Sequence, residues 1–383
     1  MERKTREVLD TLAKTLTTPI EETRALPPAA YTSEEVLDLE KEHIFRKEWL
    51  CIGREEQVAK PGDYLARDLV GEPVVVVRDA KGELHAFSNV CRHRYMQLVE
   101  GQGSTDKFVC PYHGWTYQLD GALAGAPHMN ESRIFERRNC HLPEFRVETW
   151  LGFVLVNFDP DAAPLGPQHE AAAERLASLR LGEMRMVATI DEVWDGNWKL
   201  GVENGSENYH VPRLHAPTFG SWIDLGVTES ELYDGREVGS WLFSDMQMDH
   251  VSEEAPEFAE LIGRAAAGMP EPDAGRFTGY NLHPALIMDS FPGNCVWSVW
   301  LPIDATHTRQ FGGVLVHPSE IEAGGDAFCA EHQAWTDKLN AEDYEATWRL
   351  QGGLRSRYSD PGPLSYAEGC VYYLQRFLAE RLT

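Results

Sequence analysis

The sequence has no long apolar run and comparatively little basic charge. Apolar stretches such as Val74–Val77 are far shorter than the roughly 20 residues that cross a bilayer, and the first residues lead into no signal-peptide core. Lys and Arg total 35 against 61 Asp and Glu, a net charge of −26, so the surface would repel a phosphate backbone. We therefore expect a cytoplasmic protein with no membrane or nucleic-acid partner.

Cysteine is also scarce. The seven cysteines are an odd number spread over 383 residues, which is a poor disulfide framework and favours free thiols or metal ligands. The chain shows no internal repeat or low-complexity tract, and its 43% hydrophobic and 25% charged residues are typical of a globular protein.

The length allows two or three domains at roughly 150 residues each. Residues 1–44 are expected to form N-terminal helices that pack on the catalytic domain, and residues 45–160 show short β-rich runs punctuated by glycine. Residues 161–383 mix both patterns, with a helix expected over 197–210, a strand over 280–288 and a helix around 327–339. The predicted fold class is α+β.

Cysteine and histidine pairs occur twice in the β-rich part. Cys91-Arg92-His93 is followed by Cys110-Pro111-Tyr112-His113, which together give C-x-H-x16-C-x2-H. Two Cys and two His also suit structural zinc, but zinc fingers pair Cys with Cys and His with His along the chain. One thiolate and one imidazole from each loop is the arrangement of a Rieske [2Fe–2S] centre.

This segment resembles the Rieske domain of ring-hydroxylating oxygenase large (alpha) subunits, and the stretch Cys110–Trp115 makes the match specific. Tyr95 and Met96 stand where many members have Arg and Gly, so we expect changed packing under the first loop. Two unrelated buried Cys-His pairs are the structural alternative.

A second constellation follows in the other half, where Glu207 precedes His210 and His215. We expect Pro212 to end the helix, so that both imidazoles face one point. A mononuclear Fe(II) oxygenase site needs two His and one carboxylate. Taken alone, helix-end histidines beside a solvated acid would be the simpler interpretation.

The family resemblance supplies the missing carboxylate. Family members place an aspartate shortly before a Q-x-G-L-x-S segment, which Gln351–Ser356 matches, and Asp343 lies eight residues before that glutamine. Asp343 is the predicted third ligand, and Glu342 is its rival.

The resemblance also implies a role for Glu207 outside the ligand set. In the family, an acid at this position bridges the mononuclear site of one subunit to the Rieske cluster of its neighbour, and a glutamate here resembles the subgroup of carnitine and choline monooxygenases.

Aromatic residues are weaker candidates for substrate contact, since large aromatics are usually part of the core. Trp297 and Trp300 should face opposite sides of a strand. The candidate substrate contacts are Tyr209, Trp241, Tyr280 and Trp297.

By resemblance, a Rieske β domain is inserted into a helix-grip catalytic domain with an antiparallel sheet, in a homotrimer or a multiple of it. Without a flavin- or nicotinamide-binding glycine fingerprint, electrons from NAD(P)H must arrive through a separate reductase, with or without a ferredoxin. The enzyme would use O2 to hydroxylate or dealkylate a small molecule such as an amine or quaternary ammonium compound. Aromatic ring hydroxylation, a Rieske-type electron carrier and a non-catalytic binding protein are the alternatives.

Overall fold

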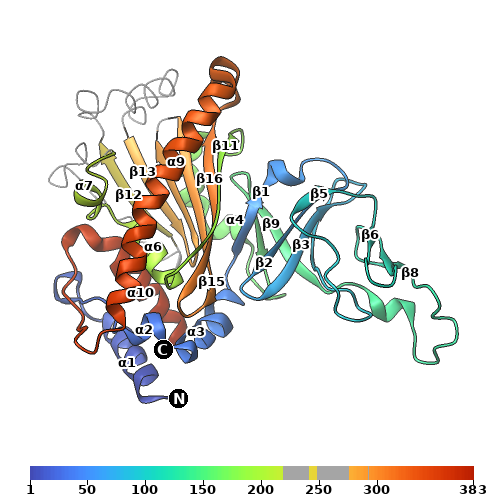
Figure 1. Cartoon of the computed structure of the whole chain (residues 1–383), viewed down its shortest axis with the longest axis horizontal. Coiled ribbons are helices and arrows are strands. Elements are labelled where there is room, and N and C mark those ends of the chain that lie inside the picture. The colour runs from blue at the N-terminus through green and yellow to red at the C-terminus, as the bar shows by residue number, and fades with distance from the viewer. Residues whose placement is uncertain (219–240, 248–275, 292) are drawn as a thin grey trace. The chain divides into compact units, whose positions relative to one another are not determined.

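The computed structural model describes residues 1–218, 241–247, 276–291 and 293–383. The chain divides into two compact units (Figure 1). The smaller unit is the continuous segment Arg46–Gly166, and the larger combines Met1–Phe45 with Pro167–Thr383. The smaller unit is therefore an insertion in the sequence of the larger one.

The smaller unit is built from short antiparallel strands. Its main sheet has seven strands in the order β1-β10-β9-β4-β3-β2-β5, and a second sheet has the order β6-β7-β8. The strands are β1 Leu50–Arg54, β2 Asp63–Leu69, β3 Glu72–Arg78, β4 Leu84–Ser88, β5 Gln102–Ser104, β6 Phe108–Val109, β7 Thr116–Tyr117, β8 Leu123–Gly125, β9 Glu144–Trp150 and β10 Phe153–Asn157. Short helical turns cover Glu55–Val58 and Arg137–Cys140. The core of this unit contains the side chains of Cys91 and Cys110.

The larger unit contains one six-stranded antiparallel sheet in the order β11-β16-β15-β14-β13-β12. Its strands are β11 Arg185–Trp194, β12 Trp241–Gln247, β13 Arg276–Leu282, β14 Leu286–Phe291, β15 Asn294–Asp304 and β16 His307–Val316. The single strand predicted over 280–288 is wrong, because the chain turns at Pro284 and pairs Leu282 with Leu286. Pro284 was the sign of this reversal in the sequence, because a proline interrupts a central strand.

The helices of the larger unit lie in Met1–Phe45 and in Pro167–Thr383, and α4 begins slightly earlier, at Leu165. They are α1 Arg3–Thr15, α2 Ala29–Thr32, α3 Glu34–Glu40, α4 Leu165–Gln168, α5 Glu170–Arg175, α6 Trp198–Ser206, α7 Val211–Leu214, α9 Pro318–Leu354 and α10 Gly369–Leu382, with shorter turns at Ile20–Glu22, Lys41–Phe45, Ala177–Leu179 and Tyr366–Glu368. The helix expected around 327–339 is part of the much longer α9, which continues to Leu354 and bends at Gly325.

Helices α6 and α9 cover the same face of this sheet, and α9 runs across it in Figure 1. A Cβ at Gly201 of α6 would lie 2.2 Å from the Trp300 ring, so this close approach requires glycine. On α9, Phe328 packs with Val296 and Val314, which are paired across β15 and β16. This arrangement, with helices across one face of an antiparallel sheet, is a helix-grip fold.

A buried ion pair connects the N-terminal helices to α6. Lys199 Nζ lies 2.6 Å from Glu40 Oε1, and both side chains are 1% exposed. The indole N–H of Trp198 donates to the other oxygen of Glu40 at 2.8 Å. Two buried charges are tolerated because they are paired and hydrogen-bonded.

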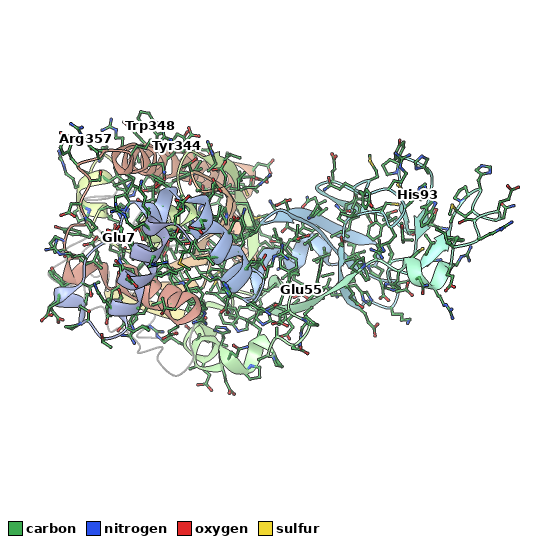
Figure 2. All side chains as sticks on the ribbon, turned by 90° about the horizontal axis from the view of Figure 1, so that it is seen from below. Glu7, Glu55, His93, Tyr344, Trp348 and Arg357 are labelled. Atoms are coloured by element: carbon green, nitrogen blue, oxygen red, sulfur yellow. The ribbon has the colours of Figure 1, made fainter. Side chains whose placement is uncertain are left out.

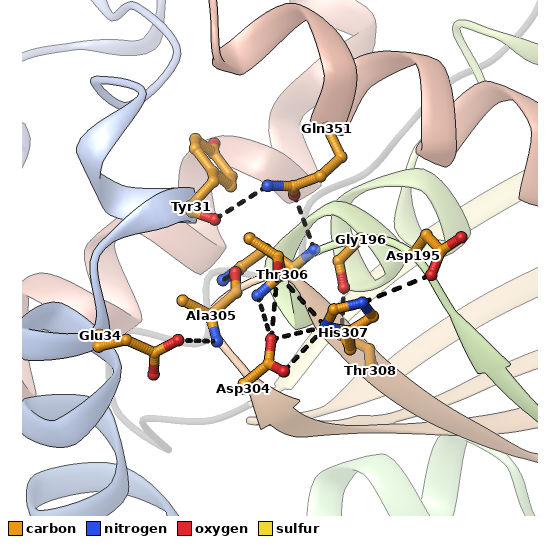
Figure 3. A network of polar contacts seen from close by, with 11 residues as sticks. Tyr31, Glu34, Asp195, Gly196, Asp304, Ala305, Thr306, His307, Thr308 and Gln351 are labelled. Carbon is orange, nitrogen blue, oxygen red and sulfur yellow. Dashed lines mark hydrogen bonds and ion pairs between the residues drawn. The ribbon is translucent and has the colours of Figure 1, made fainter.

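Gln351 near the end of α9 forms a junction of three segments (Figure 3). Its side-chain oxygen accepts from Asn197 N at 2.9 Å, and its amide donates to Tyr31 O at 3.4 Å. Asn197 also donates to Ala305 O at 2.8 Å, while its side-chain oxygen caps α6 at Lys199 N. The start of α6 is thereby held against α9 and the N-terminal helices. In the part of the chain described here, no helix is long and apolar enough to span a membrane.

Candidate metal centres

The two Cys-His loops of the smaller unit fold in the same way. In each loop the cysteine N–H donates to the carbonyl five residues later, from Cys91 to Met96 and from Cys110 to Trp115. In each loop the residue four positions after the cysteine donates back to the cysteine carbonyl. That residue has a positive φ, 59° at Tyr95 and 71° at Gly114. Repeating one turn geometry brings equivalent side chains to one place.

The four predicted cluster ligands do come together. Cys91 and Cys110 are 1% and 3% exposed, and the His93 and His113 rings are 4.7 Å apart. His93, labelled in Figure 2, stacks on Trp115, and its buried Nδ1 has no hydrogen-bond partner among the described residues. An orphaned imidazole nitrogen beside two buried thiols fits a metal cluster.

Burial also perturbs these side chains. It raises the pKa of Cys91, and the neighbouring Cys110 raises it further. Thiols in such a place are unfavourable as thiolates unless a metal binds them. Tyr117 lies below the first loop, with its hydroxyl 3.3 Å from Cys91 Sγ. The packing expected under the loop from Tyr95 is wrong, because Tyr95 is 89% exposed.

The helix predicted over 197–210 ends earlier, at Ser206. Glu207 causes this, since its Oε2 accepts the backbone N–H groups of Tyr209 and His210 and so replaces the helical hydrogen bonds. Pro212 does not end a helix but lies in the first turn of α7, where its missing N–H costs nothing. His210 and His215 therefore flank α7.

The three predicted mononuclear ligands converge in the larger unit. Nε2 of His215 lies 3.1 Å from Asp343 Oδ1, and Nε2 of His210 lies 3.7 Å from the same oxygen. One donor atom from each residue falls within 4.8 Å of the others. Burial lowers the pKa of His215, but contacts with Asp343 and Glu342 outweigh it and raise the pKa overall. The position between Asp343 and Glu342 favours the positively charged form of His215.

The outward-facing nitrogens of both histidines contact carboxylates. Glu207 Oε1 lies 2.7 Å from His210 Nδ1, and Glu342 Oε2 lies 2.7 Å from His215 Nδ1. Each contact turns Nε2 toward Asp343 and sets the tautomer suited to binding a metal. Glu342, considered above as a rival ligand, thus contacts Nδ1 of His215, whereas Asp343 contacts Nε2.

Asn204 also contacts the site, although it was not predicted from the sequence. Its amide donates to Asp343 Oδ1 at 3.0 Å and so orients the carboxylate. Its place on α6, one turn before Glu207, was the only sign available from the sequence.

Two of the predicted aromatic substrate contacts, Tyr280 and Trp297, are not brought to this site. Gly205 of α6 lies against Ile287, which pairs with Ser298, so this row faces the helices. Tyr280 and Trp297 belong to the alternate row, and the Tyr280 hydroxyl lies 3.0 Å from Nδ1 of the buried His169. That row lies on the opposite face, so the prediction for Tyr280 and Trp297 is wrong. The prediction that Trp297 and Trp300 face opposite sides is confirmed, since Trp300 meets α6.

The other two aromatic candidates have different outcomes. Tyr209 is 52% exposed, so at least half of its surface faces away from protein. Trp241 lies on β12, but its side chain lies outside what the structure describes.

A second group of potential metal ligands, Asp79, Glu83 and His85, lies at the turn between β3 and β4. Oδ1 of Asp79 accepts the backbone N–H groups of Lys81 and Glu83, each at 2.8 Å. The carboxylate is explained by the turn that it stabilises.

Comparisons with known proteins agree with this geometry. Residues 48–146 match the Rieske [2Fe–2S] domain, and residues 181–383 match the ring hydroxylating alpha subunit (catalytic domain). The chain belongs to the family of Rieske non-haem iron oxygenase alpha subunits. It is the catalytic subunit of an O2-dependent oxygenase, with a Rieske cluster and a mononuclear iron as cofactors and electrons supplied by a separate reductase.

Among its relatives is the carnitine monooxygenase oxygenase subunit of Acinetobacter pittii, 37% identical over 92% of this chain and 94% of the relative. The glycine betaine monooxygenase oxygenase subunit of Pseudomonas aeruginosa is 27% identical over 94% of this chain and 89% of that protein. The solved structure of a quaternary ammonium Rieske monooxygenase in complex with its substrate gamma-butyrobetaine is 25% identical. Its TM-score is 0.77, with 98% of this chain and 99% of that chain covered.

Proposed function

We propose that Cys91, His93, Cys110 and His113 hold the [2Fe–2S] cluster and that His210, His215 and Asp343 hold the mononuclear iron. The cluster assignment is supported by the two buried thiols and the orphaned Nδ1 of His93. The iron assignment is supported by two Nε2 atoms that face one carboxylate oxygen while both Nδ1 atoms contact carboxylates. Two His and one carboxylate on one side of a metal suit a non-haem Fe(II) oxygenase.

Iron bound at this site would supply the activation of O2, and the protein groups set the conditions for it. Glu207 and Glu342 keep each Nδ1 protonated and raise the basicity of each imidazole. Asn204 holds Asp343 Oδ1 in place. His210 and His215 flank α7 and Asp343 lies on α9, so the ligands come from two helical segments far apart in the sequence.

Glu207 is proposed to connect the two centres of neighbouring subunits. Its Oε1 contacts His210, and a carboxylate oxygen has two lone pairs, which leaves one to accept from His113 of the next subunit. A homotrimer, or a multiple of it, with head-to-tail contacts would close such a ring. In this arrangement the cluster passes electrons to the mononuclear site across the subunit boundary.

The substrate class we propose is a quaternary ammonium compound or related amine, which the enzyme hydroxylates, dealkylates or cleaves at the C–N bond. The observation that carries this proposal is the 37% identity with a carnitine monooxygenase oxygenase subunit over nearly the whole of both chains. Glu207 is a second support, because a glutamate at this position resembles the subgroup of carnitine and choline monooxygenases. One oxygen atom would enter the substrate and the other would leave as water.

The partners proposed are a reductase that oxidises NAD(P)H, with or without an intermediate ferredoxin. The excess of acidic residues would favour a basic docking surface on that partner. A cytoplasmic location is proposed because all seven cysteines lack disulfides, as is usual in a reducing compartment.

The proposal is tested with the purified enzyme, a reductase and NADH. Carnitine, gamma-butyrobetaine, glycine betaine and a set of benzoates would be offered separately, and O2 uptake would be measured with product identification by mass spectrometry. Substrate-dependent uptake with an oxygenated or C–N-cleaved ammonium compound is expected. Uptake with benzoates alone would replace the proposed substrate class by aromatic ring hydroxylation. Iron analysis should find three irons per chain, and a count of two would refute the mononuclear site.

A further inference from the structure

One acidic residue near the proposed iron site has no partner among the residues that the structure describes. Asp289 lies on β14, and its neighbours Leu286, Ile287, Met288 and Ser290 are all buried. Its own side chain is half-buried and makes no hydrogen bond or ion pair with any residue that the structure describes. Carboxylates in such surroundings are normally paired, because an unpaired buried charge is costly.

Strand register places Asp289 on the face that the helices cover. It pairs with Gly279 on β13 and Val296 on β15. Val296 packs toward Phe328 of α9, and Ile287, two residues along β14, lies under Gly205 of α6. Since residues two apart on a strand share a face, the Asp289 side chain points into the space between the sheet and these helices.

Two further observations place this carboxylate near the iron ligands. Asn281, which pairs with Ile287, donates to Ser206 at the end of α6 at 2.7 Å, immediately before Glu207. Burial, with the charge of Asp343 as a smaller cause, raises the pKa of Asp289 to about 7. Gly279, its partner on β13, has no side chain that could fill the adjoining space.

Among the described acidic residues around the site, Asp289 differs from the others because it has no partner. Iron bound by Asp343 would neutralise that carboxylate, and Glu207 and Glu342 already contact histidines. No Lys or Arg of the described residues forms an ion pair with Asp289. Of the described acids at this site, Asp289 has neither a proposed metal to bind nor a hydrogen-bond partner, and a cationic ligand would supply its counter-charge.

We propose that Asp289 is a specificity-determining residue that contacts the positively charged group of the substrate. The inference rests on the proposed function and deepens it. A quaternary ammonium group has no N–H to donate, so a protein recognises it by charge and shape. A carboxylate that has no partner among the described residues and points between the sheet and the helices supplies that charge.

The test compares two ligands of the same shape and different charge. In 5,5-dimethylhexanoate a carbon replaces the ammonium nitrogen of gamma-butyrobetaine, so the two differ by one positive charge. Binding would be measured by calorimetry on the oxidised holoenzyme, and kcat/KM by O2 uptake. Wild-type enzyme should bind gamma-butyrobetaine more tightly.

Asp289→Asn should weaken gamma-butyrobetaine binding about 10- to 100-fold, as expected for loss of a contact between charged groups. The neutral analogue should change less than about 3-fold, and Asp289→Leu should bind it at least as well as wild type. The matched control is Asp326→Asn, which removes the same charge from an exposed position on α9 and should change neither affinity.

A structural role for Asp289 makes a different prediction. Because Asp289 has no described partner, Asp289→Asn should unfold at the wild-type temperature or above it and should keep its iron and Rieske spectrum. A strongly destabilised or iron-depleted variant would overturn the inference.

The remaining outcomes separate this inference from the proposed function. A wild-type enzyme that oxidises ammonium compounds, together with an Asp289→Asn variant of unchanged selectivity, would overturn the role of Asp289 alone. A wild-type enzyme inactive on every ammonium compound would overturn both.

Discussion

The two candidate metal centres are built in opposite ways. The Cys-His centre uses two short loops of one continuous segment, and each loop repeats the same pair of backbone hydrogen bonds. The His-His-Asp centre joins a helix end to a distant helix, since Glu342, the neighbour of Asp343, follows His215 by 127 positions in the sequence. The first centre depends on local turns, whereas the second depends on the packing of the whole larger unit.

The strongest test of the second centre is removal of Asp343. Asp343→Ala should lose the mononuclear iron and all turnover while the Rieske spectrum persists, since among the described residues only this carboxylate faces both Nε2 atoms. Iron analysis and visible absorbance provide the measurement. Glu342→Ala is the control. Loss of iron from Glu342→Ala, together with retention of iron by Asp343→Ala, would reverse the two assignments.

Breaking the buried Lys199–Glu40 pair tests the dependence on packing. Lys199→Met leaves an unpaired buried carboxylate, which should lower the free energy of unfolding by about 3–5 kcal/mol. Urea unfolding followed by circular dichroism measures this change. The exposed pair Glu345–Arg349 provides the control, since Arg349→Met should cost less than about 1 kcal/mol. Equal effects would mean that the buried pair contributes no more than a surface pair.

Glu207→Gln tests the contact that would join the two centres. The amide is nearly isosteric but carries no charge to stabilise a histidine partner, so both centres should fill while turnover falls about 10- to 100-fold. Single-turnover oxidation of the pre-reduced cluster by O2, followed by absorbance, measures the transfer. An unchanged rate would exclude the bridge, and loss of iron would make Glu207 a ligand.

The smallest effects are expected in the two loops. Gly114→Ala places a side chain at φ 71° with no atom closer than 3.8 Å, so the backbone alone should cost about 1 kcal/mol. Tyr95→Gly removes a similar strain in the other loop and should stabilise by less than about 1 kcal/mol. Thermal unfolding of the holoenzyme measures both, and changes of the same sign would contradict the shared geometry.

The difference between a centre built from local turns and one built from long-range packing also decides how much of each centre could be predicted from the sequence. The four residues of the first centre lie in a spacing that is itself informative, because each loop holds its pair within four positions. The third ligand of the second centre required a family resemblance. Asp343 and Glu342 are adjacent on α9, about 100° apart around the helix axis, and only tertiary structure shows which one faces the histidine Nε2 atoms.

The errors of prediction have physical causes as well. The helix expected to reach His210 stops at Ser206, because the Glu207 side chain takes over the backbone N–H groups that follow. The aromatic residues Tyr280 and Trp297 were judged by type, but strand register places them on the opposite face. Asp289 was overlooked because a single acid on a strand has no pattern around it.

The junction at Gln351 has a consequence for the order of assembly during synthesis. The Cys-His loops need only the continuous segment Arg46–Gly166, which leaves the ribosome while the rest is still being made. Tyr31, Asn197 and Gln351 meet only when nearly the whole chain is present, and such long-range contacts form slowly. Cluster insertion should therefore precede iron loading, and nascent chains truncated before α9 should be able to acquire only the first cofactor.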